Sequence, residues 1–363
     1  MHILILNWRD PKNPLAGGAE IVTFEHAKAW VKAGHTVTWF TSRFRGMPKD
    51  EVLQGVHFIR KGGSLGVYLF APFFYLESKN KFDIVIDEIH GIPFFTPLYV
   101  HNSKKVAFIH EVAGEIWDYM YPFPINYIGK LLEIFYFKIY QHVKFWTDAP
   151  STIDELVSKG IPWGNCTAIP CPITNSIVSK IPEKEKDPTF IFVSRLVKMK
   201  GIERVLEAFK YIVEKESKAK LWIVGPGDPS YVSVLHDRVR LLGPSVKFWG
   251  RVSQVKKLEL MGKAHVLLHA SVKEGWGLVV LEAGSQGTPA VVYNVAGLRD
   301  VVKDGKTGVV LVRNTPEDLA QEALKLLYDK KQYALYQKNG LEWVKGLTWE
   351  KTTLESESLL KSL

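Results

Sequence analysis

Cysteine is scarce in this sequence: only Cys166 and Cys171 occur among 363 residues. Two cysteines cannot build a disulfide framework or a cysteine metal cluster, and they suit a reducing compartment. No run of 18 apolar residues occurs, so the sequence predicts no transmembrane helix. The opening segment MHILILNWRD lacks the basic region and cleavage site of a signal peptide and is typical of a first strand. These absences favour a cytoplasmic location.

Several binding motifs are absent as well. The sequence has no G-x-G-x-x-G fingerprint for a dinucleotide, no D-x-D pair for a divalent metal and no motif that binds DNA or RNA. The net charge is +9, with 18 basic and 16 acidic side chains in residues 1–180 and 29 and 22 in residues 181–363. The surplus in the second half favours an anionic small ligand there, and we expect no nucleic-acid partner and no metal.

Short apolar segments typical of strands alternate with helical stretches along the whole chain. The strand segments are HILIL, TVTWFT, FDIVID and KVAFIH in the first half, and TFIFVS, KLWIVG, VKFWG, HVLLHA and PAVVY in the second. This alternation predicts an α/β fold with parallel sheets that helices cover on both faces.

The length of the chain suits two such domains. The segment SKIPEKEKDP, with two prolines and a charge cluster, is the predicted linker. We further expect helical stretches at about 315–328 and 330–361. The predicted organisation is a Rossmann-like N-terminal domain (1–178), the linker (179–188), a Rossmann-like C-terminal domain (189–345) and a C-terminal helix (346–363) that packs back toward the first domain.

The stretch SVKEGWGLVVLEAGSQG places two carboxylates around a helix start. Glu274 falls in the turn, and Glu282 falls about one and a half turns into the helix. Free backbone N–H groups at a helix start bind anions, and carboxylates accept hydrogen bonds from neighbouring hydroxyls. The stretch therefore predicts a ligand that contains sugar and phosphate, although an exposed turn and a half-exposed helix residue would look the same. The N–H groups belong to Gly277, Leu278 and Val279.

A basic turn in the segment FVSRLVKMKG follows a predicted strand. Arg195 and Lys200 could neutralise a departing diphosphate there, and Gly201 opens the next helix. The alternative is a solvated basic turn, which is what we expect of Lys198 between them.

The order of strand, E-x(7)-E, helix and GTPAVVY resembles the retaining glycosyltransferases of family four. Those enzymes have the GT-B fold, in which two Rossmann-like domains face each other across a cleft. The resemblance implies that the domain at 1–178 binds the acceptor and that the domain at 189–345 binds the nucleotide-sugar. The resemblance implies that Glu274 contacts the transferred sugar and that Glu282 contacts the ribose of the donor. Two departures are Trp276 in place of the usual phenylalanine and PCPITN in place of an Asn-Gly pair. The R-L…K-G run of the family is matched by Arg195, Leu196, Lys200 and Gly201.

The same resemblance implies further site residues. His110 would lie near the transferred sugar and orient a hydroxyl, although a lone histidine is also common in protein interiors. The other assignments compete with ordinary turns that need glycine. They are Gly17 and Gly18 near donor and acceptor, Gly225 in a loop beside the donor, and Arg251 and Val252 in the base pocket.

Two aromatic-rich helical stretches lie in the first half, at 66–76 and 121–146. The stretch 121–146 is predicted to form a helix with a polar face opposite a broad apolar one. The residues of the polar face are Asn126, Lys130, Glu133, Gln141 and Lys144. Such a helix is typical of a membrane interface, but both stretches could also pack on the N-terminal sheet. The membrane alternative would favour a lipid-linked acceptor.

The sequence thus predicts a metal-independent, retaining glycosyltransferase without a cofactor. It would move a hexose from a UDP- or GDP-linked donor to a hydroxyl of a glycan or lipid-linked acceptor, in the cytoplasm or on the inner face of the cell membrane. The alternatives are a GT-B nucleotide-sugar epimerase and a non-catalytic, membrane-associated nucleotide-sugar-binding protein. A Rossmann oxidoreductase is disfavoured because its fingerprint is missing.

Overall fold

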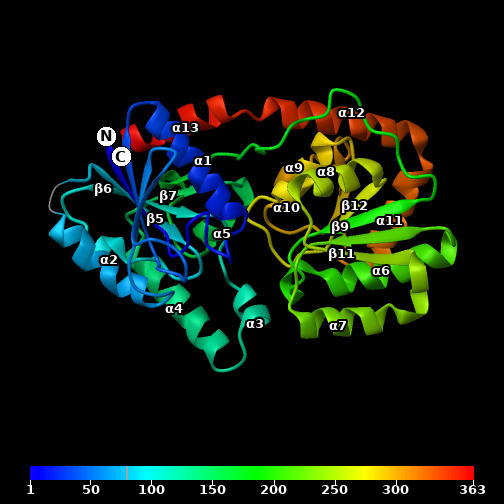
Figure 1. Cartoon of the computed structure of the whole chain (residues 1–363), viewed down its shortest axis with the longest axis horizontal. Coiled ribbons are helices and arrows are strands. Elements are labelled where there is room, and N and C mark those ends of the chain that lie inside the picture. Colours follow the sequence, from blue (N-terminus) through cyan, green and yellow to red (C-terminus); the bar gives the residue numbers. More distant parts are fainter. Residues whose placement is uncertain (79–80) are drawn as a thin grey trace. The chain divides into compact units, whose positions relative to one another are not determined.

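The computed structural model describes residues 1–78 and 81–363 (Figure 1). The chain forms two compact α/β units. The change from one unit to the other falls between Cys171 and Pro172, ahead of the segment 179–188 predicted as a linker. Unit 1 comprises Met1–Trp117, Tyr121–Cys171 and Trp349–Leu363, and unit 2 comprises Asp118–Met120 and Pro172–Thr348.

Unit 1 is built on an eight-stranded sheet of order β3-β4-β2-β1-β5-β6-β7-β8. All neighbouring strands run parallel except β3, which pairs antiparallel with β4. The strands are β1 (His2–Leu6), β2 (Thr36–Thr41), β3 (Asp50–Leu53), β4 (Val56–Arg60), β5 (Ile84–Ile89), β6 (Lys104–Ile109), β7 (Lys144–Thr147) and β8 (Cys166–Ala168).

Helices cover both faces of this sheet. Leu4 of β1 and Val85 of β5 are register partners that pack with α2 (Gly66–Glu77), and Ala107 of β6 packs with α4 (Ile125–Ile139) and α5 (Pro150–Ser158). Val85 stands two residues before Asp87, the register partner of Ala107, so these helices lie on the same face. The opposite face of the sheet packs against α1 (Gly18–Lys32). The short helices of this part of the chain are η1 (Thr96–Leu98), α3 (Ile116–Met120) and η2 (Trp163–Asn165).

The C-terminal segment returns to unit 1. The stretch predicted as helical over 330–361 consists of two helices: α12 (Lys330–Gly346) ends at a glycine, Leu347 is extended, and α13 (Trp349–Ser362) follows. Helix α13 lies beside α1, where the indole Nε1 of Trp30 donates a hydrogen bond to Ser356 Oγ at 3.1 Å (Figure 1).

Unit 2 contains a six-stranded parallel sheet of order β11-β10-β9-β12-β13-β14. Helices α6, α7 and α11 cover one face and form the main core with β9 and β10, whereas α8 and α9 cover the other (Figure 1). Across both units, each of the nine predicted strand segments contains a strand, and β3, β4, β7, β8 and β14 lie outside those segments. The elements are β9 (Thr189–Val193), η3 (Lys198–Lys200), α6 (Ile202–Lys215), β10 (Lys220–Val224), α7 (Pro229–Arg238), η4 (Arg240–Ser245), β11 (Val246–Gly250), α8 (Gln254–Lys263), β12 (Val266–His269), α9 (Leu278–Ser285), β13 (Ala290–Val292), α10 (Leu298–Val301), β14 (Gly308–Val310) and α11 (Pro316–Tyr328).

The polar face predicted for residues 121–146 is wrong. Glu133 is buried, where its carboxylate accepts a hydrogen bond from Gly114 N at 2.8 Å and pairs with Lys159 at 3.0 Å. Gln141 and Lys144 lie beyond the end of α4. The outward face of α4 is instead apolar, and its exposed large side chains are Ile125, Tyr127, Ile128, Leu131, Ile134 and Phe135.

Helix α2 repeats this arrangement on the same face of the sheet. Val67, Ala71 and Tyr75 pack inward, so the helix contributes to the core as one alternative expected. Its outward side chains are nevertheless large and apolar. We call the exposed residues Leu69, Phe70, Phe73 and Leu76 of α2, together with the six of α4, the apolar face of unit 1.

Candidate active site

Four loops of unit 2 meet at one edge of its sheet. Arg195 follows β9, Gly225 follows β10, Arg251 and Val252 follow β11, and Glu274 lies in the loop after β12. Because these strands are parallel and adjacent, their carboxyl ends share one edge, which is where ligands of open α/β sheets bind. The fold therefore gathers the residues that the sequence singled out in the second half.

Three polar side chains contact the Glu274 carboxylate at this edge of the sheet. Its Oε1 lies 2.7 Å from Lys200 Nζ and 3.0 Å from His269 Nε2, and it accepts a hydrogen bond from Ser271 Oγ at 2.7 Å. Burial alone would raise the pKa of Glu274, but the Lys200 charge and His269 bring that pKa well below its usual range. Glu274 is therefore a carboxylate held in one position by three neighbours.

Glycine brings Lys200 to this position. Gly201 has a φ of +72°, and a Cβ atom on it would lie 1.9 Å from the carbonyl oxygen of Ala270. Only glycine allows such close contact between the turn before α6 and the end of β12. The K-G pair in the sequence therefore has a structural reason, which is to set the lysine beside Glu274.

The start of α9 supplies backbone donors. Gly277 caps the helix with a φ of +91°, and α9 begins at Leu278. First-turn N–H groups have no partner within a helix, so those of Leu278 and Val279 can serve a ligand. Farther along α9, Glu282 accepts hydrogen bonds from Lys257 Nζ at 2.7 Å and Gln254 Nε2 at 3.0 Å. The Arg195 side chain is exposed to solvent.

Unit 1 offers a second set of residues at the carboxyl edge of its own sheet. The Gly17–Gly18 pair follows β1 and opens α1, where Gly17 N donates a hydrogen bond to Glu20 Oε2 at 2.6 Å. Arg9 Nε donates to the other oxygen of Glu20 at 2.7 Å. His110 follows β6, two strands away in the sheet.

His110 is the centre of a buried network that sequence reasoning missed. Its Nδ1 lies 2.5 Å from Asp148 Oδ2, and its Nε2 lies 3.2 Å from Glu88 Oε1. Glu88 Oε1 also lies 3.1 Å from His90 Nε2 and accepts a hydrogen bond from Thr23 Oγ1 at 2.9 Å. Polar residues at strand ends were the available signal, because Glu88 lies near the end of β5, His90 follows that strand and Asp148 follows β7.

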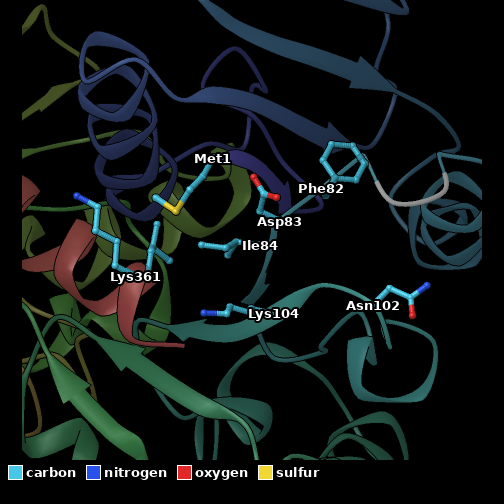
Figure 2. A pocket seen from close by; sticks show the side chains of 8 residues that line it. Met1, Phe82, Asp83, Ile84, Asn102, Lys104 and Lys361 are labelled. Atoms are coloured by element: carbon cyan, nitrogen blue, oxygen red, sulfur yellow. The ribbon is translucent and has the colours of Figure 1, made fainter.

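The hollow of about 470 Å³ in Figure 2 lies elsewhere in unit 1. Ile84 and Lys104, which line it, begin β5 and β6, so it opens at the amino ends of the strands. Lys361 of α13 closes one side (Figure 2). Because ligands of parallel sheets bind at the carboxyl ends, this hollow is separate from the candidate site.

Two family models match the chain and together span most of it. The model described as Glycosyltransferase Family 4 matches residues 16–176, and the model described as Glycosyl transferases group 1 matches residues 174–343. The chain belongs to the group 1 glycosyltransferases. Its resemblance to this family is thereby confirmed, and the matched range of the second model contains the Lys200, Glu274 and Glu282 motifs.

Individual relatives agree with this assignment. The uncharacterized glycosyltransferase MJ1607 of Methanocaldococcus jannaschii is 26% identical over 359 residues, which are 91% of this chain and 90% of that protein. The N-acetyl-alpha-D-glucosaminyl L-malate synthase of Bacillus anthracis is 33% identical over 147 residues, or 40% of this chain and 38% of that protein.

Solved structures establish the GT-B fold of this glycosyltransferase. Sucrose-phosphate synthase of Thermosynechococcus elongatus matches with a TM-score of 0.81 at 20% identity, covering 99% of this chain and 98% of that one. HepE of Anabaena, solved with UDP and glucose, matches with a TM-score of 0.75 at 16% identity over the whole of both chains. Within the described residues, no helix combines the length and apolar composition needed to cross a bilayer.

Proposed function

We propose that this glycosyltransferase moves a hexose, with retention of anomeric configuration, from a UDP- or GDP-linked donor to a hydroxyl of a glycan or lipid-linked acceptor. The observation that carries the proposal is the Lys200–Glu274 pair beside the start of α9. A fixed cation, a fixed carboxylate and free helix N–H groups at one sheet edge match a ligand in which phosphate adjoins sugar.

The roles follow from the charge that develops during transfer. When the bond between the sugar and the diphosphate breaks, negative charge grows on the departing phosphate oxygens. Lys200, Arg195 and the N–H groups of α9 stabilise that charge, because donors already in place need no reorganisation. The acceptor hydroxyl attacks from the face on which the leaving group departs.

The remaining residues position the donor. Glu274 accepts hydrogen bonds from the hexose, and Glu282 accepts them from the ribose. His110 and the Gly17–Gly18 turn of unit 1 meet the sugar, and the loops at Gly225 and after β11, with Arg251 and Val252, hold the nucleotide. The UDP and glucose bound to HepE of Anabaena support a donor of this class.

We expect turnover that needs neither magnesium nor manganese, since protein cations supply the charge. Thermal shift and hydrolysis over a panel of UDP- and GDP-hexoses identify the donor, and transfer is then measured after exhaustive chelation. Unchanged rates are the expected result. Activity that vanishes and returns only with Mg²⁺ or Mn²⁺ would mean that the diphosphate site has been assigned wrongly.

We also propose that the apolar face of unit 1 docks on the inner face of the cell membrane. Ile128 and Phe135 of α4 are 58% and 59% exposed, and Leu69 of α2 is 72% exposed. Large apolar side chains gathered on one face of a unit are typical of an interaction site. Tyr127, which is amphipathic, and the exposed Lys138 suit the boundary between lipid and water. A lipid-linked acceptor would then be within reach.

Exchanging exposed residues of α4 for serine tests this docking. Ile128→Ser with Phe135→Ser should abolish flotation with anionic liposomes and leave donor binding unchanged. Tyr136 is unsuitable for the test, because it is fully buried in the core. The matched control is Leu354→Ser on α13, which is 68% exposed outside the apolar face. A folded double variant that still floats would place the contact elsewhere.

Salt dependence separates the two forces in this docking. Residues 1–180 carry 18 basic and 16 acidic side chains, so their net charge is small. Insertion of apolar side chains should therefore contribute more to binding than electrostatic attraction to the lipid. Binding should therefore weaken as salt rises without disappearing. Complete release at moderate salt would contradict insertion of the apolar face.

A further inference from the structure

Both ring nitrogens of His110 face carboxylates. Asp148 Oδ2 lies 2.5 Å from Nδ1, and Glu88 Oε1 lies 3.2 Å from Nε2. A neutral imidazole has only one N–H, so it would leave one of these carboxylates against a lone pair. The geometry therefore favours the imidazolium, which donates to both sides.

The surroundings of His110 agree with this charge. Burial alone would lower its pKa, but Asp148 and Glu88 together raise it to about 10. Burial alone would raise the pKa of Glu88, yet the two histidines lower it to about 2. The ionisable groups that face His110 are Asp148, Glu88, His90 and His26. Burial is the main cause that lowers the pKa of His26 to about 3. Cys171 contacts Asp148 on the side away from His110.

The two carboxylates hold His110 unequally. Asp148 Oδ2 is close to Nδ1, and Asp148 Oδ1 accepts from the thiol of Cys171 at 2.7 Å, so this side is fixed. On the other side, Glu88 Oε1 serves Thr23, His90 and His110 at once, while Glu88 Oε2 is buried with no hydrogen-bond partner. The N–H at Nε2 can therefore leave Glu88, because Oε1 keeps two other neighbours.

We propose that His110 acts in the transfer as a permanently charged hydrogen-bond donor, with Asp148 as its positioning residue and Nε2–H redirected from Glu88 to an oxygen of the bound substrate. This inference rests on the proposed function and specifies it. His110 cannot then serve as a general base, because no ring nitrogen carries a lone pair. Its partner must be an oxygen that accepts, such as a sugar hydroxyl or a phosphate oxygen.

The charge state can be read in the wild-type protein without any assay of transfer. In histidine-labelled protein, the ring ¹⁵N and ¹³C signals of His110 should show no loss of a proton between pH 5.5 and about 9. Deprotonation near the ordinary value of about 6.5 would overturn the proposal. This reading stands even if no donor in the panel is turned over, so it is separate from a failure of the proposed function.

Asp148→Asn tests the positioning role. Asparagine still accepts a hydrogen bond from Nδ1–H but removes the charge that keeps the ring protonated. The ratio of variant to wild-type kcat/KM should fall at least tenfold as pH rises from 6 to 9, because His110 now loses its proton in that range. A ratio that is the same at every pH would show a merely structural role. The control is Cys171→Ser, which keeps a donor to Asp148 and should follow the wild-type profile.

Measuring the zinc content of the protein tests whether His110 is instead a metal ligand. Donor atoms of Glu88, His90 and His110 lie within 4.8 Å of one another, a spacing that a zinc ion could use. A zinc ion on Nε2 would require a deprotonated nitrogen. Purified protein incubated with zinc and then desalted should carry none at this cluster, and one equivalent lost in His90→Ala would overturn the proposal.

Discussion

Replacing Lys200 by alanine should lower kcat/KM for transfer by about 10²- to 10³-fold, the effect of removing one fixed donor from a developing negative charge. Lys200 Nζ lies 2.7 Å from Glu274, so the substitution removes the cation and also frees the carboxylate that it orients. Most of the loss should fall on kcat, since the stabilisation grows as the diphosphate departs.

The matched control is Lys198→Ala two residues earlier. Lys198 is exposed on the same turn and should behave like wild type, because a solvated charge contributes little. Circular dichroism checks that both variants are folded. Equal losses in the two variants would mean that the turn responds only to net charge, and wild-type activity of folded Lys200→Ala would remove Lys200 from the mechanism.

The two glutamates of the E-x(7)-E stretch should give separable defects. Glu282→Ala should weaken binding of the free nucleoside diphosphate ten- to a hundredfold, because a ribose hydroxyl pair loses its acceptor. Glu274→Ala should leave that binding nearly intact but lower transfer by a similar factor. Each estimate corresponds to one charge-assisted hydrogen bond of about 1.5–3 kcal/mol.

Calorimetry with UDP and GDP measures the first effect, and the rate of transfer measures the second. The control is Glu259→Ala on α8, whose carboxylate pairs only with the surface lysines Lys256 and Lys263 among the described contacts. Equal losses of nucleotide affinity in Glu274→Ala and Glu282→Ala would contradict the division of roles.

The site of unit 2 could be predicted because local sequence determines it. Gly201 and Gly277 adopt positive φ values, and each fixes a turn beside the functional residue next to it in the chain. Parallel strands then bring the turns to one edge without further information. What the sequence did not reveal was that Lys200 and Glu274 pair directly, with His269 and Ser271 as further partners.

The network of unit 1 could not be predicted in the same way. Glu88 lies in β5, whereas His110 and Asp148 follow β6 and β7, and only the strand order makes them neighbours. One of these strands, β7, was itself not predicted. The polar residues at the strand ends were visible in the sequence, but which of them pair could not be inferred until the strand order was known.

Helix α4 shows a second limit. A polar face was predicted from the positions of its charges, but Glu133 points inward because Lys159 and Gly114 N satisfy its carboxylate there. Such partners lie 19 or more residues away in the chain. A buried charge with distant partners reverses the apparent sides of a helix, so periodicity alone could not assign them.

Proton NMR of one reaction tests the central claim most directly. The protein is incubated with the donor that the panel identifies and a hydroxyl acceptor, and the anomeric signals are followed as nucleoside diphosphate appears. The proposed function predicts one product sugar per diphosphate released, with the anomeric configuration of the donor. An inverted product, or an epimerised donor formed without net release of diphosphate, would contradict it.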